Sequence, residues 1–184
     1  MAVVQQISWQ GVRAFTIGHS TRTQDELIDL LRRFGVAILV DVRSIPRSAH
    51  NPQFEQTELL RALPAAGIRY AHLRRLGGLR HARRDSVNLA WHNASFRGFA
   101  DYMDSAEFEL GLAELRELAR QGTVALMCAE AVPWRCHRSL LADVLVVRGA
   151  QVEHITGPST PRTHRLTAFA HVQDGRIAYP ATSG

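Results

Sequence analysis

AILVDV, residues 37 to 42, is a short apolar run that predicts a buried β-strand. A helical pattern precedes it, because Thr23 to Glu26 has the Thr-x-x-Glu form of a capping box and Gly35 is a natural C-terminal stop. The alternation continues, with strands expected at 14–18, 68–73, 123–130 and 151–155 and helices at 57–66, 96–103, 105–120 and 136–148. Strands that alternate with helices predict an α/β fold: a doubly wound, mostly parallel five-stranded sheet with helices on both faces.

The whole chain, residues 1–184, reads as a single α/β domain. Its core is expected at about 12–156, followed by a C-terminal arm at 157–184 that forms an extended tail or a hairpin around Gln173-Asp174-Gly175. A strand order of 3-2-1-4-5 makes the first and fourth strands neighbours. Ligands of such sheets bind at the carboxyl ends of the strands, so we expect the functional site there.

Composition excludes several classes of protein. A chain of 184 residues with 46% hydrophobic residues can bury a core without metals or disulfides, which excludes disorder as the main description. The apolar runs, such as 36–40, are far shorter than the roughly 18 residues that a membrane-spanning helix needs. The N-terminus has no basic segment followed by a long apolar core, so we expect no signal peptide, a cytoplasmic location and reduced cysteines.

The charge pattern is more informative. All 22 basic residues are arginine, which excludes a lysine Schiff base or a P-loop lysine, and the net charge is +5. Arginine binds phosphate and carboxylate in a bidentate manner, so a phosphorylated small molecule or a nucleic acid is the expected partner. An arginine-favouring codon usage is the other explanation of this composition.

Polar residues gather where the predicted strands end. Burial of such residues is unfavourable unless they are paired, so they indicate either a functional site or a structural hydrogen-bond network. We expect catalytic roles for His19, Cys128 and Glu130. Expected anion- or substrate-binding residues are Gly18, Ser20, Arg43, Arg47, Cys136, His137 and Arg138.

At these positions the chain resembles a known bacterial family, the one filed as domain of unknown function 488. The resemblance is carried by TIGHST at 16–21, LVDVRSIPRS at 39–48, LGG at 76–78, FRGFADYM at 96–103 and LMCAE…CHR at 126–138. It implies a small cytosolic α/β protein whose motifs lie near one site. It implies no established reaction.

Two interpretations of the polar cluster involve anions and acid–base chemistry. A helix that begins near Cys136 would direct its free N–H groups toward an anion, and Gly18 would let a ligand approach the backbone. Arg43 and Arg138 could add contacts to phosphate, or could instead pair with acids such as Asp41 and Glu130. Glu130 and His19 provide a carboxylate and an imidazole that could act as base and acid.

Two further interpretations involve the cysteines. A cysteine at a strand end near arginine and histidine can have a depressed pKa and act as a nucleophile. Phosphatase-like and rhodanese-like loops place five residues between cysteine and arginine, whereas six separate Cys128 from Arg135. Cys128 and Cys136 are also possible metal ligands, but neighbouring residues such as Cys136 and His137 point about 100° apart on a helix. We therefore assign no metal ligands.

The cofactor stays unassigned, because Gly18-His19-Ser20 is not a G-x-G-x-x-G dinucleotide fingerprint. The segment from Arg74 to Asn93 is rich in arginine and is expected to be a solvated loop, a flap or a phosphate contact. The sequence thus predicts an enzyme that hydrolyses or transfers a group on a nucleotide or nucleic-acid-like phosphorylated substrate. The alternatives are a non-catalytic nucleic-acid-binding module and a thiol- or metal-dependent site.

Overall fold

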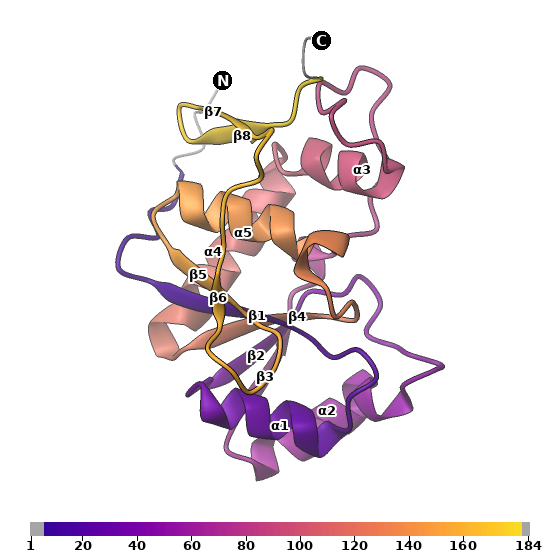
Figure 1. The fold of residues 1–184 in the computed structure, drawn as a ribbon, viewed down its shortest axis with the longest axis vertical. Coiled ribbons are helices and arrows are strands. Elements are labelled where there is room, and N and C mark those ends of the chain that lie inside the picture. The colour runs from indigo at the N-terminus through magenta and orange to yellow at the C-terminus, as the bar shows by residue number, and fades with distance from the viewer. Residues whose placement is uncertain (1–5, 182–184) are drawn as a thin grey trace.

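The structure is a computed structural model that describes residues 6–181, and it is a three-layer α/β fold (Figure 1). Its first ten elements are β1 (Arg13–Gly18), α1 (Gln24–Arg33), β2 (Ile38–Asp41), α2 (Gln56–Ala65), β3 (Arg69–His72), α3 (Ala94–Tyr102), α4 (Ala106–Gln121), β4 (Val124–Cys128), α5 (Arg138–Val147) and β5 (Gln151–Ile155). Three short strands follow: β6 (Arg162–Thr163), β7 (His171–Gln173) and β8 (Arg176–Ala178).

The central sheet has the order β3-β2-β4-β1-β5-β6, in which the first five strands are parallel and β6 is antiparallel to β5. The α/β class and the mostly parallel sheet are therefore confirmed. The expected order 3-2-1-4-5 is wrong, because β4 lies between β2 and β1. Every residue of β4 is buried, which is typical of a central strand covered on both faces.

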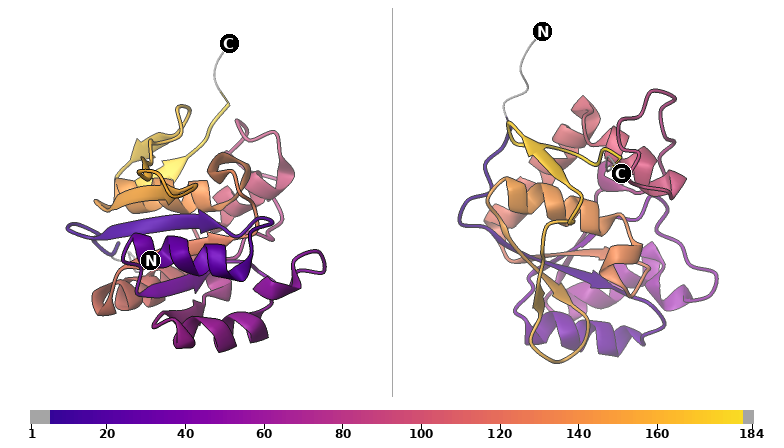
Figure 2. Two further views of the ribbon diagram at one scale, coloured as in Figure 1. Left: turned by 60° about the horizontal axis from the view of Figure 1, so that its bottom comes forward. Right: turned by 45° about the horizontal axis from the view of Figure 1, so that its top comes forward.

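The sheet also has six strands rather than five. The additional strand, β6, is only two residues long and pairs Glu153 with Thr163 in register. It lies in the stretch that the sequence assigned to a C-terminal arm. Within the described part of this stretch, β7 and β8 form the expected hairpin, which turns at Gly175 and lies over α5 (Figure 2).

Helices cover both faces of the sheet, and each face has its own hydrophobic core. In Figure 1, α1 and α2 lie on one face and α3, α4 and α5 on the other. The first core includes Phe15 and Phe54, and the second includes Phe99 and Tyr179. Ile177 and the fully buried Tyr179 belong to this second core, so the segment from β8 to Tyr179 packs against the domain.

Local sequence signals explain the helix ends well at α1. The Thr23 hydroxyl accepts from the Glu26 amide at 3.1 Å, and the Glu26 carboxylate accepts from the Thr23 amide at 2.7 Å, which confirms the capping box. At α5 the prediction is wrong by two residues. Cys136 is extended after a 3₁₀ turn at Pro133–Arg135, and the helix begins at Arg138.

No helix within residues 6–181 combines the length and the apolar character that crossing a membrane requires.

Candidate functional site

The two cysteines lie side by side at the carboxyl edge of the sheet. Cys128 is the last residue of β4, and the 3₁₀ turn at Pro133–Arg135 brings Cys136 back to it. The Cys136 thiol donates to Cys128 Sγ across 2.7 Å, and both residues are buried and not joined by a disulfide. Both cysteines are predicted site residues, and the structure brings them into contact.

Arg138 makes this pair unusual. Its side chain is fully buried, and its Nη1 donates to Cys128 Sγ at 2.5 Å. The remaining contacts are main-chain carbonyls, Glu130 O at 2.6 Å and Ala131 O at 3.0 Å. Within residues 6–181, no carboxylate lies within ion-pair distance of this guanidinium. A buried charge without a partner is strongly unfavourable, so the thiolate of Cys128 is the countercharge that the fold supplies.

The pKa values of the two thiols move in opposite directions. Burial alone would raise the pKa of Cys128, but the hydrogen bond from Cys136 and the charge of Arg138 outweigh it and lower this pKa to about 7. The pKa of Cys136 is raised, chiefly because its proton is held in the hydrogen bond to Cys128 and also because it is buried. Above about pH 7 the site therefore contains mostly one thiolate, Cys128, and one thiol, Cys136.

His137 adjoins Cys136 and is held in one tautomer. Its Nε2 lies 3.0 Å from Leu76 O and 3.1 Å from Val42 O, and carbonyl oxygens only accept, so Nε2 carries the proton. Burial lowers the pKa of His137 to about 4 despite these hydrogen bonds. Its Nδ1 is therefore unprotonated and lies 3.5 Å from Cys136 Sγ, whose proton is directed at Cys128.

A second group of predicted residues centres on Arg43, just beyond β2. Its Nε and Nη2 donate to the two carboxylate oxygens of Asp41 at 2.9 and 2.6 Å, and Nη2 also donates to Phe54 O. Its Nη1 lies 3.4 Å from Nε2 of His19. A guanidinium has five N–H groups, so four of these are engaged and one on Nη1 remains for a ligand.

His19 contacts the guanidinium of Arg43 and helps to fix its position. Its Nδ1 donates to Ser20 O at 2.9 Å, so Nε2 is the unprotonated nitrogen that accepts from Arg43. The ring stacks on Phe54 with 4.4 Å between centroids, and burial lowers its pKa. His19 is thus a neutral positioning residue in this structure, and its imidazole has no proton on the side that faces Arg43.

A pocket of about 430 Å³ brings the cysteines and Arg43 together. Two exposed apolar side chains, Ile45 and Leu79, are part of its wall, and each exposes more than half of its surface. Its polar and charged lining includes Arg43, Ser44, Arg47, Asn93, Ser95, Cys128, Glu130, Arg135, Cys136 and His137. The pocket therefore extends from the buried thiols of Cys128 and Cys136 to a rim that contains three arginine side chains.

Two predicted residues, Glu130 and Gly18, lie differently from their expected roles. The Glu130 side chain is exposed at the rim, where it accepts from the Val132 amide, and only its carbonyl reaches Arg138. A Cβ atom added at Gly18 would lie 1.9 Å from Glu130 O, so this glycine makes room for the loop rather than for a ligand. Arg47 is exposed and lines the pocket.

The start of α5 does not offer the expected row of free amides. The amide of Ser139 donates to Cys136 O, and those of Leu140 and Leu141 donate to His137 O. The preceding loop turns carbonyl oxygens toward Arg138. We therefore place no anion at this helix end, in contrast to the expectation from the sequence. Within residues 6–181 no group of three His, Cys, Asp or Glu side chains forms a metal-binding cluster.

Sequence reasoning missed a second polar network. Thr16 Oγ1 lies 2.6 Å from His154 Nδ1, His154 Nε2 lies 2.8 Å from His164 Nδ1, and His164 Nε2 lies 2.7 Å from Asp143 Oδ1. Tyr179 donates to the other oxygen of Asp143 at 2.8 Å. These residues are far apart in the sequence and form no motif, so only the fold shows their connection.

Fold and site together define a doubly wound α/β protein with a buried cysteine–arginine pair at the carboxyl edge of its sheet. The family profile described as "Domain of unknown function DUF488" matches residues 23–145, and the chain belongs to this family. A search of curated proteins and a search of solved structures return no match.

Proposed function

We propose that this protein is a thiol-dependent enzyme that hydrolyses or transfers a group on a phosphorylated substrate, with the Cys128 thiolate as nucleophile. The contact between Cys128 and the fully buried Arg138 carries the proposal. Since no carboxylate neutralises Arg138 within residues 6–181, the fold favours a thiolate at the floor of the pocket. The thiolate is the reactive form of cysteine.

The proposed reaction has two steps. In the first, Cys128 Sγ forms a bond to an electrophilic atom of the substrate, and the leaving group departs with its electron pair and takes a proton from water. In the second, water attacks that atom, the bond to sulfur breaks, a proton is released and the thiolate returns. Before the first step the Cys136 thiol donates to Cys128 Sγ, which stabilises the negative charge of the thiolate.

The phosphate of the substrate serves as a binding handle in this proposal. The loop after β4 presents the carbonyls of Glu130 and Ala131 rather than a row of amides, which does not suit phosphoryl oxygens at the sulfur. Arg47 and Arg135 are exposed at the rim of the same pocket, and Arg43 has one N–H available there. We therefore place the phosphate at this rim and the reacting atom at Cys128.

The alternative, a non-catalytic nucleic-acid-binding module, uses the same basic face, and the arginines between 74 and 84 are its further candidate contacts to phosphate. Three of them have partners. Arg75 pairs with Glu107 and Glu114, and Arg83 pairs with Asp85. The guanidinium of Arg80 lies 3.6 Å from the centre of the Tyr102 ring. These contacts reduce the charge that the segment can offer to a phosphate backbone. The enzyme proposal is therefore the one that we favour.

The test is the reactivity of the thiols in the native protein. Iodoacetamide is expected to label Cys128, with a rate that reaches half of its maximum near pH 7, and Cys128→Ala abolishes this labelling. Cys136→Ala keeps Cys128 but removes the hydrogen bond that lowers its pKa, so labelling should persist with its midpoint at a higher pH. Incubation with phosphorylated compounds, followed by acid quench and intact-mass measurement, is expected to trap an adduct on Cys128. Two cysteines that react only after denaturation would overturn the proposal.

A further inference from the structure

A second and larger pocket, of about 830 Å³, lies on the other side of the loop after β4. Its volume is in the range of pockets that hold small-molecule ligands. The 3₁₀ turn at Pro133–Arg135 separates the two pockets, since Pro133 and Trp134 line the larger one and Arg135 lines the smaller one. Segments from β5, β6 and the stretch after them complete its wall.

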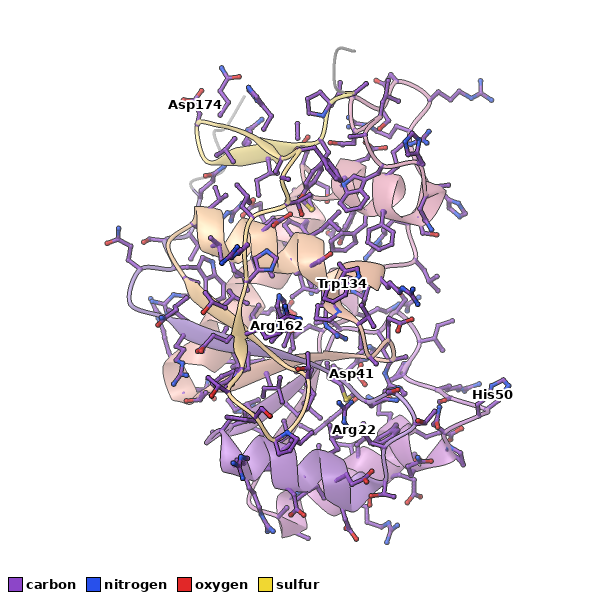
Figure 3. The ribbon with its side chains drawn as sticks, in the orientation of Figure 1. Arg22, Asp41, His50, Trp134, Arg162 and Asp174 are labelled. Atoms are coloured by element: carbon purple, nitrogen blue, oxygen red, sulfur yellow. The ribbon has the colours of Figure 1, made fainter. Side chains whose placement is uncertain are left out.

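The wall of this pocket combines an aromatic surface with unpaired positive charge. Trp134 exposes 63% of its surface, an unusual exposure for so large an apolar side chain. Arg162 and Arg165 are exposed and, within residues 6–181, neither lies within ion-pair distance of a carboxylate. Trp134, from the 3₁₀ turn, and Arg162, from β6, both line this pocket and are labelled in Figure 3.

The floor of the pocket is rigid. His154 and His164 line it, and all four ring nitrogens of the two imidazoles are engaged in the chain from Thr16 to Asp143. Neither ring has a nitrogen left for proton transfer to a ligand. The network therefore fixes the shape of the wall and the position of β6, and it points to binding rather than to chemistry in this pocket.

We propose that this pocket binds a nucleoside phosphate, with the base stacked on Trp134 and the phosphate held by Arg162 and Arg165. A planar base matches the indole face, and a guanidinium matches a phosphate in geometry and charge. Hydroxyl groups of Thr156, Thr163 and Thr167, which also line the pocket, suit the polar edges of a base and a sugar. None of the lining residues within the described range is acidic.

Most of this wall lies outside residues 23–145, the range that the family profile matches. His154, Arg162, His164 and Arg165 belong to the C-terminal part of the chain. Trp134 lies within the matched range, so the pocket is built from both parts of the chain. The inference goes beyond the proposed function and does not rest on it. The 3₁₀ turn separates this pocket from Cys128, so the nucleoside phosphate bound here is a second ligand and not the compound that reacts at the thiolate.

Calorimetry with Cys128→Ala protein tests the binding separately from the thiol chemistry. The probes are a nucleoside monophosphate, the free nucleoside, ribose 5-phosphate and inorganic phosphate. We expect the nucleoside monophosphate to bind at least about tenfold more tightly than each of the other three, because only it engages both the indole and the arginines. Equal binding of ribose 5-phosphate or inorganic phosphate would reduce the pocket to an anion site and overturn the inference.

Variants then locate the binding. Trp134→Ala and Arg162→Ala are each expected to weaken the affinity for the nucleoside monophosphate about tenfold or more, whereas Arg33→Ala, an equal loss of charge on exposed α1, leaves it unchanged. Melting temperatures of all variants show that they fold. Unchanged affinity in Trp134→Ala overturns the inference, as does binding of an oligonucleotide alone. Neither outcome affects the alkylation of Cys128, so the two proposals fail separately.

Discussion

Gly78 lies against the ring of His137, and a Cβ atom at this glycine would be 2.5 Å from Nδ1 and 2.6 Å from Cγ. The absent side chain lets the loop after β3 close over the histidine, whose Nε2 donates to Leu76 O in the same loop. The glycine therefore sets the position of the imidazole beside Cys136. The motif LGG at 76–78, noted in the sequence for its resemblance alone, has this physical explanation.

Gly78→Ala should destabilise the protein by about 1 to 3 kcal/mol, because the ring must move and its buried N–H loses a carbonyl partner. Urea denaturation measures the change. Gly157→Ala is the matched control, since a Cβ there meets nothing within 4 Å, and its effect should stay below about 0.5 kcal/mol. Equal stability of the two variants would contradict the packing described for His137.

Asp41→Asn should cost about 3 to 5 kcal/mol, because it leaves the buried guanidinium of Arg43 without its countercharge. Both partners of this ion pair are almost fully buried. The control is Glu58→Gln, which breaks the exposed pair with Arg61 and should cost about 1 kcal/mol or less. Guanidinium chloride also screens ion pairs, so the comparison is best made in urea. A loss below about 1 kcal/mol for Asp41→Asn would contradict the pairing.

Much of the fold is visible in the sequence because it depends on local patterns. Apolar runs at β1, β2 and β4 mark buried strands, and Thr23 with Glu26 marks the start of α1. The position of β4 between β2 and β1 is not visible, because strand order depends on which edges pair across long stretches of chain. The two residues of β6 carry no periodicity at all.

The candidate site was predictable in its members and not in their contacts. Arg43 follows the end of β2, and Arg138 begins the helix after β4. Both are buried, and their partners distinguish them: Arg43 pairs with Asp41, whereas Arg138 contacts a cysteine and carbonyl oxygens. The sequence cannot show this difference, because it depends on how the loop at 129–137 turns its carbonyl groups.

Acid should destabilise the protein through His154. Burial, together with the nearby charges of His164 and Arg138, lowers the pKa of His154 to about 3, whereas an unfolded histidine has a pKa of about 6.5. Below pH 6.5 the unfolded chain therefore binds the proton and the folded chain does not. The stability is present above this pH and is lost progressively as the pH falls toward 3.

Unfolding free energies between pH 7.5 and 4.5 measure this loss. His154→Gln removes the titrating group, so its stability should fall less steeply with pH than that of the wild type. His50→Gln, on an exposed loop (Figure 3), is the control and should keep the steeper profile. Parallel profiles for wild type and His154→Gln would show that His154 is not buried in its neutral form.

Hydrogen peroxide should join Cys128 and Cys136 in a disulfide. The thiolate of Cys128 attacks one peroxide oxygen, the O–O bond breaks and hydroxide departs. Cys128 is then a sulfenic acid. The sulfur of Cys136, 2.7 Å away, then attacks Cys128 Sγ, the S–O bond breaks and water leaves. Intact mass should show the loss of two hydrogens, and Cys128 should resist iodoacetamide. Dithiothreitol should restore the original mass and the labelling of Cys128.

Cys136→Ser is the control that retains the thiolate but cannot form the disulfide. Its oxidation should stop at the sulfenic acid, which dimedone traps, or proceed to the sulfinic acid. A wild type that forms sulfinic acid as fast as this variant would show that the second sulfur does not reach the first.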